Sequence, residues 1–126
     1  MKTISILILR ILMGVIFVTH GAARLYYQSV PEFGALLNSK GLVAGVALAW
    51  LVTIGEIIGG SLLAAGYKVT YSIIFLAVVI FAGIILVHMP NGWFTVGQGT
   101  GGMEYSVLIL AVLAVLYIHY KPSKFF

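Results

Sequence analysis

The sequence contains no cysteine, only three acidic residues and only three prolines among its 126 residues. The absence of cysteine excludes disulfides, thiolate metal sites and cysteine-based redox relays, so any electron transfer would need a cofactor from elsewhere. Charged residues make up 8% of the chain and apolar residues 62%, which lies far outside the range of soluble globular proteins. The sequence therefore predicts an integral membrane protein.

Four apolar stretches account for most of the chain. They cover residues 4–27, 42–65, 69–88 and 103–120, and a helix needs about 20 such residues to cross the hydrocarbon core. Because lipid offers no partner to unpaired backbone groups, each stretch is expected to be a helix. The predicted fold class is all-α, a four-helix transmembrane bundle that forms a single domain over residues 1–126.

The connections and charges predict how the bundle is arranged. Residues 31–41 are expected to form a loop, residues 66–68 a tight turn, and the third connection a glycine-rich loop. Five basic residues fall at one end of the bundle, against Arg24 and Lys40 at the other, which places both termini in the cytoplasm. Most of these charges flank apolar segments, so nucleic acid is not an expected partner. The first stretch has some features of a secretory signal, but three more follow, and we expect it to be retained.

Small residues in the second stretch predict close helix packing. Gly55 and Gly59 form a G-x-x-x-G motif, and Gly45, Ala49 and Glu56 follow the same general face. The motif is explained either by packing inside one chain or by contact between two copies, and the first explanation is favoured because the motif is common in membrane helices.

Glu56 is the strongest candidate for a functional residue. It lies fourteen residues beyond Leu42, which places it about 21 Å along the helix and near the middle of the bilayer. An ionised carboxylate there costs about 2.5 to 3.5 kcal/mol, so it is usually protonated, paired or set in a polar cavity. The alternative is a protonated glutamic acid that only hydrogen-bonds to a neighbouring helix.

Two more candidates lie near the end of the first helix. His20 and Arg24 are four residues apart and share one face, so both can point into the bundle. Arg24 is explained equally well by snorkelling, in which its charged head reaches the lipid head groups. Arg10, near the other end of this helix, is expected to be such an anchor.

The glycine-rich loop is flanked by further polar residues. His88 ends the third helix, because a proline and an Asn-Gly turn signal follow it. Glu104 begins the fourth helix, where a carboxylate also suits the helix dipole. Asn91 can be an ordinary turn residue, and Gln98 and Tyr105 can supply hydrogen bonds or simply lie at the membrane interface.

Under one topology these residues fall at the same end of the bundle, with Glu56 below them, and can converge on one pocket. The candidate catalytic residues are Glu56, His88 and Glu104, and the candidate ligand-binding residues are His20, Arg24, Asn91 and Tyr105. Two carboxylates and one guanidinium leave one negative charge unbalanced, which protonation of a glutamate or a histidine would relieve, so the site would respond to pH. No metal site is predicted, because the Glu-x-x-His pairs of di-iron bundles are missing.

Several strings contain these residues: Arg10-Ile-Leu-Met-Gly14, His20-Gly21 with Arg24-Leu25, Gly55-Glu56-Ile-Ile-Gly-Gly60, and His88 with Gly102-Met-Glu104-Tyr105. Together they make the sequence resemble the DoxX family of small four-helix bacterial membrane proteins. The resemblance implies a multi-pass protein of the bacterial inner membrane. Relatives include the membrane subunit of a thiosulfate:quinone oxidoreductase, which implies a redox setting.

Three functions fit the sequence. The first is a component of a membrane oxidoreductase that binds a quinone or a similar small redox molecule in an outer polar pocket. The second is an accessory or scaffold subunit without chemistry, whose outer aromatic residues Trp93 and Phe94 contact other protein subunits of a membrane complex. The third, a proton-coupled transporter, is disfavoured because the chain shows neither an inverted repeat nor a broken helix.

Overall fold

A computed structural model describes residues 2–95 and 101–121 of the chain. All regular structure in these ranges is helical, which confirms the predicted all-α membrane bundle. The helices are α1 (Lys2–Tyr26), α2 (Val30–Ser39), α3 (Gly45–Ala65), α4 (Val69–Gly83) and α5 (Glu104–Tyr120). A π-helical turn, η1 (Ile84–His88), and a 3-10 turn, η2 (Met89–Asn91), extend α4.

Three helical segments among the described residues are long and apolar enough to cross a membrane. They are Ile4–Tyr26, Gly45–Ala65 and Val69–Asn91. The fourth, Glu104–Tyr120, is apolar but has only 17 residues, which gives it a length of about 25 Å. Each of the four stretches proposed from the sequence thus contains an apolar helix, and three of these helices are long enough to cross a membrane.

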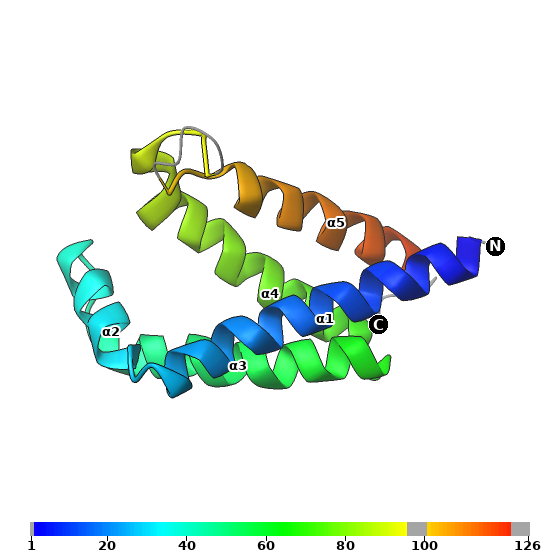
Figure 1. Cartoon of the computed structure of the whole chain (residues 1–126), viewed down its shortest axis with the longest axis horizontal. Coiled ribbons are helices and arrows are strands. Elements are labelled where there is room, and N and C mark those ends of the chain that lie inside the picture. The colour runs from blue at the N-terminus through cyan, green and yellow to red at the C-terminus, as the bar shows by residue number, and fades with distance from the viewer. Residues whose placement is uncertain (1, 96–100, 122–126) are drawn as a thin grey trace.

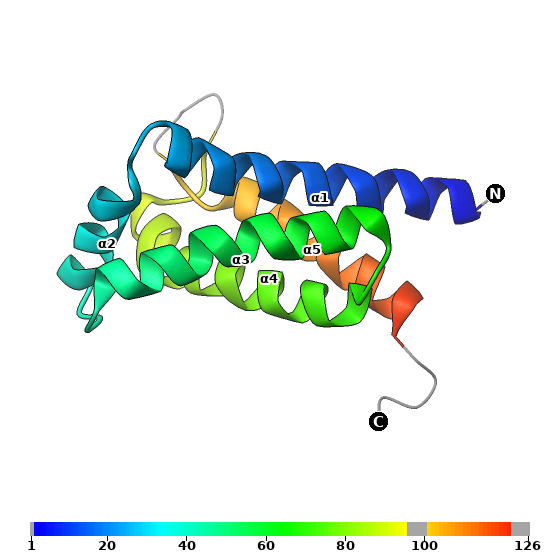
Figure 2. The same cartoon turned by 90° about the horizontal axis from the view of Figure 1, so that it is seen from below.

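The two ends of the bundle differ in how closely the helices approach. At the turn end, defined by residues 66–68 and Tyr120, the α4–α5 pair lies close to the α1–α3 pair (Figure 1). At the site end, defined by α2 and residues 84–104, the two pairs diverge (Figure 1). Figure 2 shows that α1 and α3 run side by side and that α2 lies at their site end.

Glycines bring α1 and α3 together. A Cβ atom on Gly14 would come within 2.5 Å of the Gly60 carbonyl oxygen, and one on Gly21 within 2.8 Å of the Thr53 carbonyl oxygen. Backbone therefore meets backbone along this interface. Gly55 and Gly59, the pair of the G-x-x-x-G motif, instead lie against Phe75 and Leu76 of α4, so the motif serves packing within the chain.

Arg10 joins three helices at the turn end. Its Nη1 donates to the Tyr120 hydroxyl at 3.1 Å, and its Nη2 donates to the Ala64 carbonyl at 3.2 Å. Ala64 lies in the last turn of α3, where unpaired carbonyls and the helix dipole favour a cation. The expectation that Arg10 is only an interfacial anchor was therefore incomplete, because the side chain is half-buried and bonded within the bundle.

The apolar core divides into two clusters. The larger cluster, towards the turn end, joins four helices through Met13, Phe17, Leu63, Val69, Ile73, Leu76, Ile109, Leu113 and Leu116. The smaller cluster joins α2 to α3 through Val30, Leu37 and Ala49.

The loop expected over residues 31–41 was wrong, because most of it is helix α2. Pro31 lies in the first turn, where its missing N–H costs nothing, and Gly41 follows the helix with a φ of 95°. Val30 and Leu37 form the apolar face that packs on α3. Asn38 then accepts a hydrogen bond from the Gly45 N–H at 2.9 Å, which fixes α2 against the start of α3.

Candidate functional site

A cavity of about 510 Å³ lies between the helices at the site end. Its walls come from α1, α2, α3, α4, η1, the start of α5 and the loop before it. Most lining side chains are apolar. The polar side chains are His20, Arg24, Glu56, His88, Thr95, Tyr105 and Ser106.

An ion pair between α1 and α3 lies in the cavity wall. Arg24 Nη1 is 2.6 Å from Glu56 Oε1, and only 5% of the Glu56 side chain and 21% of the Arg24 side chain are exposed. Glu56 is the twelfth residue of α3, about 16 Å along its axis. The Arg24 side chain is therefore directed into the bundle and does not snorkel to the interface. Glu56 forms an ion pair with it, and this differs from the alternative in which Glu56 only hydrogen-bonds to a neighbouring helix.

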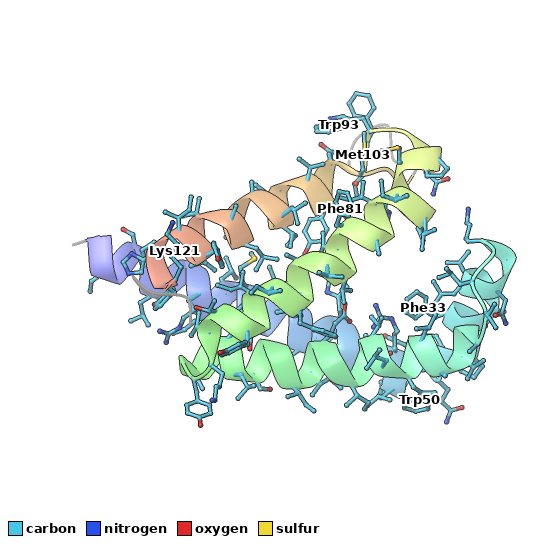
Figure 3. The ribbon with its side chains drawn as sticks, turned by 180° about the vertical axis from the view of Figure 1, so that it is seen from behind. Phe33, Trp50, Phe81, Trp93, Met103 and Lys121 are labelled. Atoms are coloured by element: carbon cyan, nitrogen blue, oxygen red, sulfur yellow. The ribbon has the colours of Figure 1, made fainter. Side chains whose placement is uncertain are left out.

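Two further side chains enclose the Arg24 guanidinium. Its Nη1 also lies 3.4 Å from Thr53 Oγ1, one turn before Glu56 on α3, and Thr53 is fully buried. The Phe33 ring of α2 lies over it, 4.7 Å from Cζ to the ring centroid. Figure 3 shows Phe33 on the side of α2 that faces α4. Both contacts favour the charged guanidinium in a cavity that is otherwise mainly apolar.

Both cavity histidines have one ring nitrogen bound to the backbone. His20 Nδ1 donates to the Ile16 carbonyl at 2.9 Å, and His88 Nδ1 donates to the Gly101 carbonyl at 3.0 Å. A carbonyl oxygen can only accept, so Nδ1 carries the hydrogen in each ring. In the neutral ring Nε2 is then a hydrogen-bond acceptor. The Tyr105 ring stacks on His20 with 6.3 Å between centroids.

Thr95, Gly101 and Gly102, which belong to the loop before α5, line the cavity at its site end. Backbone hydrogen bonds of 2.8 to 3.0 Å join residues 92–94 to residues 102–104. Glu104 Oε1 accepts the Thr95 N–H at 2.6 Å, and Thr95 Oγ1 donates to the Gly102 carbonyl at 2.9 Å. Glu104 thus holds the loop, and its neighbours Tyr105 and Ser106 line the cavity.

The structure brings five of the seven candidate residues to the cavity: His20, Arg24, Glu56, His88 and Tyr105. Glu104 and Asn91 do not line it. Consequently the charged side chains that line the cavity are one guanidinium and one carboxylate, and the unbalanced negative charge expected from the sequence is not found among the described lining residues. Gln98 lies outside the described residues.

Phe33 and Thr53 are site residues that the sequence analysis missed. Thr53 could have been found, because it lies three residues before Glu56 and therefore on the same face of α3. Phe33 could have been predicted as a site residue only if α2 had been predicted to be a helix. Within the described part of the chain no cluster of three or more histidine, aspartate or glutamate side chains could hold a metal ion.

These features define a multi-pass membrane bundle with a charged pair in an inter-helix cavity. The family model for DoxX matches residues 5–89, more than half of the chain, and the chain belongs to the DoxX family. The match includes His20, Arg24, Glu56 and His88. No curated protein and no solved structure matches the chain.

Proposed function

We propose that the cavity binds the head group of a quinone or quinol, and that the chain is a component of a membrane oxidoreductase system in the bacterial inner membrane. The observation that carries this proposal is the Arg24–Glu56 ion pair in the wall of a largely apolar cavity. Both termini face the cytoplasm in this proposal, because Arg10, Lys68 and Lys121 lie at the turn end. The site end and its cavity then lie towards the outer side.

The size and lining of the cavity fit such a ligand. A volume of about 510 Å³ falls in the range of pockets that enclose small organic molecules. A quinone head group is a flat ring with polar oxygens at opposite edges, so it needs apolar walls and a few polar groups at separate positions. Leucine and valine side chains supply the walls, and Arg24 and the two histidines supply the polar groups.

The hydrogen-bonding groups suit both oxidation states of the ring. Arg24 can only donate, so it suits a quinone carbonyl oxygen. His20 and His88 carry their hydrogen on Nδ1, so each Nε2 accepts from a quinol hydroxyl while the ring is neutral. Glu56 holds Arg24 in position and adds carboxylate oxygens as acceptors.

The role proposed for this chain is to bind the ring and to take or return its protons. A bound quinone supplies two-electron, two-proton chemistry. His20 and His88 are the proton acceptors in this scheme, and His88 lies beside the loop through which a proton would leave. The electron-transfer partner belongs to another subunit of the system.

The test is binding of tail-less analogues to purified protein in lipid nanodiscs. Menadione and its reduced form should bind to the wild type, as measured by isothermal titration calorimetry. Glu56→Gln and Arg24→Gln should each weaken binding by about tenfold or more, which corresponds to about 1.4 kcal/mol and to the loss of one charge-assisted hydrogen bond. Glu32→Gln on α2 is the matched control, because Glu32 is exposed and does not line the cavity.

An accessory role without chemistry is the second candidate. Trp93 and Phe94 in the loop are 46% and 48% exposed, and Figure 3 shows Trp93 directed away from the bundle. Exposed aromatic side chains of this kind suit contact with a partner subunit. The accessory role would be supported if the wild type failed to bind the analogues and Trp93→Ala prevented assembly of the complex. The same results would contradict the proposed quinone-binding role.

A further inference from the structure

The apolar wall of the cavity is also part of the lipid-facing surface. Leu51 of α3 and Val78 of α4 line the cavity, yet they are 58% and 62% exposed. They belong to two helices that pack against each other. The cavity is therefore accessible sideways, from the hydrocarbon core of the bilayer.

A separate apolar groove follows the same boundary towards the turn end. It has a volume of about 330 Å³ and lies between Leu51 and Phe75 at one end and Lys68 at the other. Gly55 and Gly59 also line it. Ile54, Ile58 and Tyr71 form its edges and are all more than 40% exposed. We name this feature the α3–α4 groove.

The α3–α4 groove adjoins the cavity, because Leu51 and Phe75 line both of them. On α4 the residues of the groove and those of the cavity share one face, since Lys68, Tyr71, Phe75, Val78 and Ala82 follow one another at intervals of three or four. From Lys68 to Ala82 this face extends for about 21 Å.

The chemistry of the lining differs between the cavity and the groove. Charged and hydrogen-bonding side chains are concentrated in the cavity, at Arg24, Glu56 and the two histidines. The groove is lined almost entirely by apolar atoms until it reaches Lys68. The Lys68 ammonium lies 5.7 Å and 5.9 Å from the Tyr67 and Tyr71 ring centroids, an arrangement typical of the membrane interface. The groove thus remains within the hydrocarbon layer.

We infer that the ligand is a membrane-resident amphiphile with a long apolar tail, whose head group occupies the cavity and whose tail leaves past Leu51 and Phe75 to lie in the α3–α4 groove. This inference rests on the proposed function and specifies its substrate class as a prenyl-tailed quinol taken from the bilayer, not a water-soluble one. The residues shared by groove and cavity, and the single α4 face that lines both, favour this occupant over an unconnected phospholipid chain or a helix of a second copy.

The test locates the tail directly. A prenyl-tailed quinone that carries a diazirine in its tail is photolysed with the protein in nanodiscs, and the adducts are mapped by mass spectrometry. We expect adducts on the groove residues of α3 and α4. A tail-less analogue at ten times its Kd should reduce these adducts roughly tenfold, because it displaces the attached head group.

Ile58→Trp is the decisive variant, because Ile58 lines the groove but not the cavity. The indole should block the groove and remove most adducts while binding of the tail-less analogue is retained. Ile8→Trp is the matched control, since Ile8 on α1 is 59% exposed against 56% for Ile58 and lines neither pocket. Ile54→Trp provides a second variant at the groove edge.

The possible outcomes separate the two proposals. Adducts spread over α1 and α5, or groove adducts that resist the tail-less competitor, would overturn the tail position and leave the head-group site intact. Unchanged groove adducts in Ile58→Trp and Ile54→Trp would overturn it as well. Failure of the wild type to bind the tail-less analogue would overturn the proposed function, and with it this inference.

Discussion

Arg24 Nη1 and Glu56 Oε1 lie 2.6 Å apart, and this contact joins the end of α1 to the middle of α3. Each charge would be costly alone in the hydrocarbon layer, and the pair is neutral overall. The guanidinium is also held by Thr53 and covered by Phe33. The pair therefore serves both to join two helices and to place polar atoms in an apolar cavity.

A double-mutant cycle should detect this coupling. Glu56→Gln and Arg24→Gln should each lower the free energy of unfolding by about 1 to 3 kcal/mol, because each leaves a largely buried charge or polar group without its partner. The double variant should lose less than the sum by about 1 to 2 kcal/mol. The free energy of unfolding of the wild type, the two single variants and the double variant is measured by denaturant unfolding in mixed micelles. Additive losses would show that the two side chains do not interact.

Adjacent glycines on α3 should respond differently to alanine. A Cβ on Gly60 would come within 2.8 Å of the Gly14 carbonyl oxygen and 3.0 Å of the Val18 backbone nitrogen, so α1 must move. Gly60→Ala should therefore destabilise the protein by about 1 to 3 kcal/mol. A Cβ on Gly59 meets Leu76 at an ordinary 3.5 Å, so Gly59→Ala should be neutral or stabilising by up to about 1 kcal/mol. Thermal unfolding compares the two variants, and equal effects would contradict the proposed interface.

Arg10 should contribute more to stability than an exposed cation. Arg10→Gln removes the hydrogen bonds to Tyr120 and Ala64, and we expect a loss of about 1 to 3 kcal/mol. Arg10→Lys should recover only part of it, because one ammonium does not reproduce the two-armed geometry. Lys40→Gln, at an exposed position beyond α2, is the control and should change stability by less than about 0.5 kcal/mol. A loss no larger than that of the control would mean that Arg10 is an anchor only.

Glu104 should control the opening of the loop before α5. Its Oε1 accepts the Thr95 N–H at 2.6 Å, and a hydrogen bond to a charged acceptor contributes about 1.5 to 3 kcal/mol. Glu104→Ala should therefore speed hydrogen exchange of the Thr95 amide by roughly tenfold to a hundredfold. Glu104→Gln keeps an acceptor oxygen and should show a smaller change. Tyr105→Phe, one residue away, should leave this amide unaffected.

The sequence predicted the long helices but not α2. Apolar stretches longer than about 18 residues leave lipid-exposed backbone no alternative to a helix. Helix α2 has ten residues, and its flanking proline and glycine suggested a loop. Pro31 and Gly41 are, however, also typical of the first turn and the end of a helix. The seven-residue spacing of the apolar residues Val30 and Leu37 favours the helix over the loop. The π-helical turn that ends at His88 was not predicted either, because apolar periodicity does not distinguish it from an α-helix.

The candidate site was predicted in part, for reasons of helix phase. His20 and Arg24 share a face because they are one turn apart, and both reach the cavity. Glu104 and Tyr105 are neighbours and differ by about 100° around α5, so their side chains point in different directions. The sequence could not decide which of them turns inward. The path of the loop decided it, because Glu104 accepts the Thr95 amide and leaves Tyr105 at the cavity wall.

The shortness of α5 has a consequence for the surrounding bilayer. With 17 residues it falls short of the roughly 30 Å hydrocarbon thickness, whereas α1 has 25 residues and exceeds it. Lipids beside α5 must therefore compress or tilt to match it, while those beside α1 are under no such strain. The hydrocarbon layer is therefore expected to be thinner beside α5 than beside α1, so lipids on different sides of the bundle are deformed to different extents.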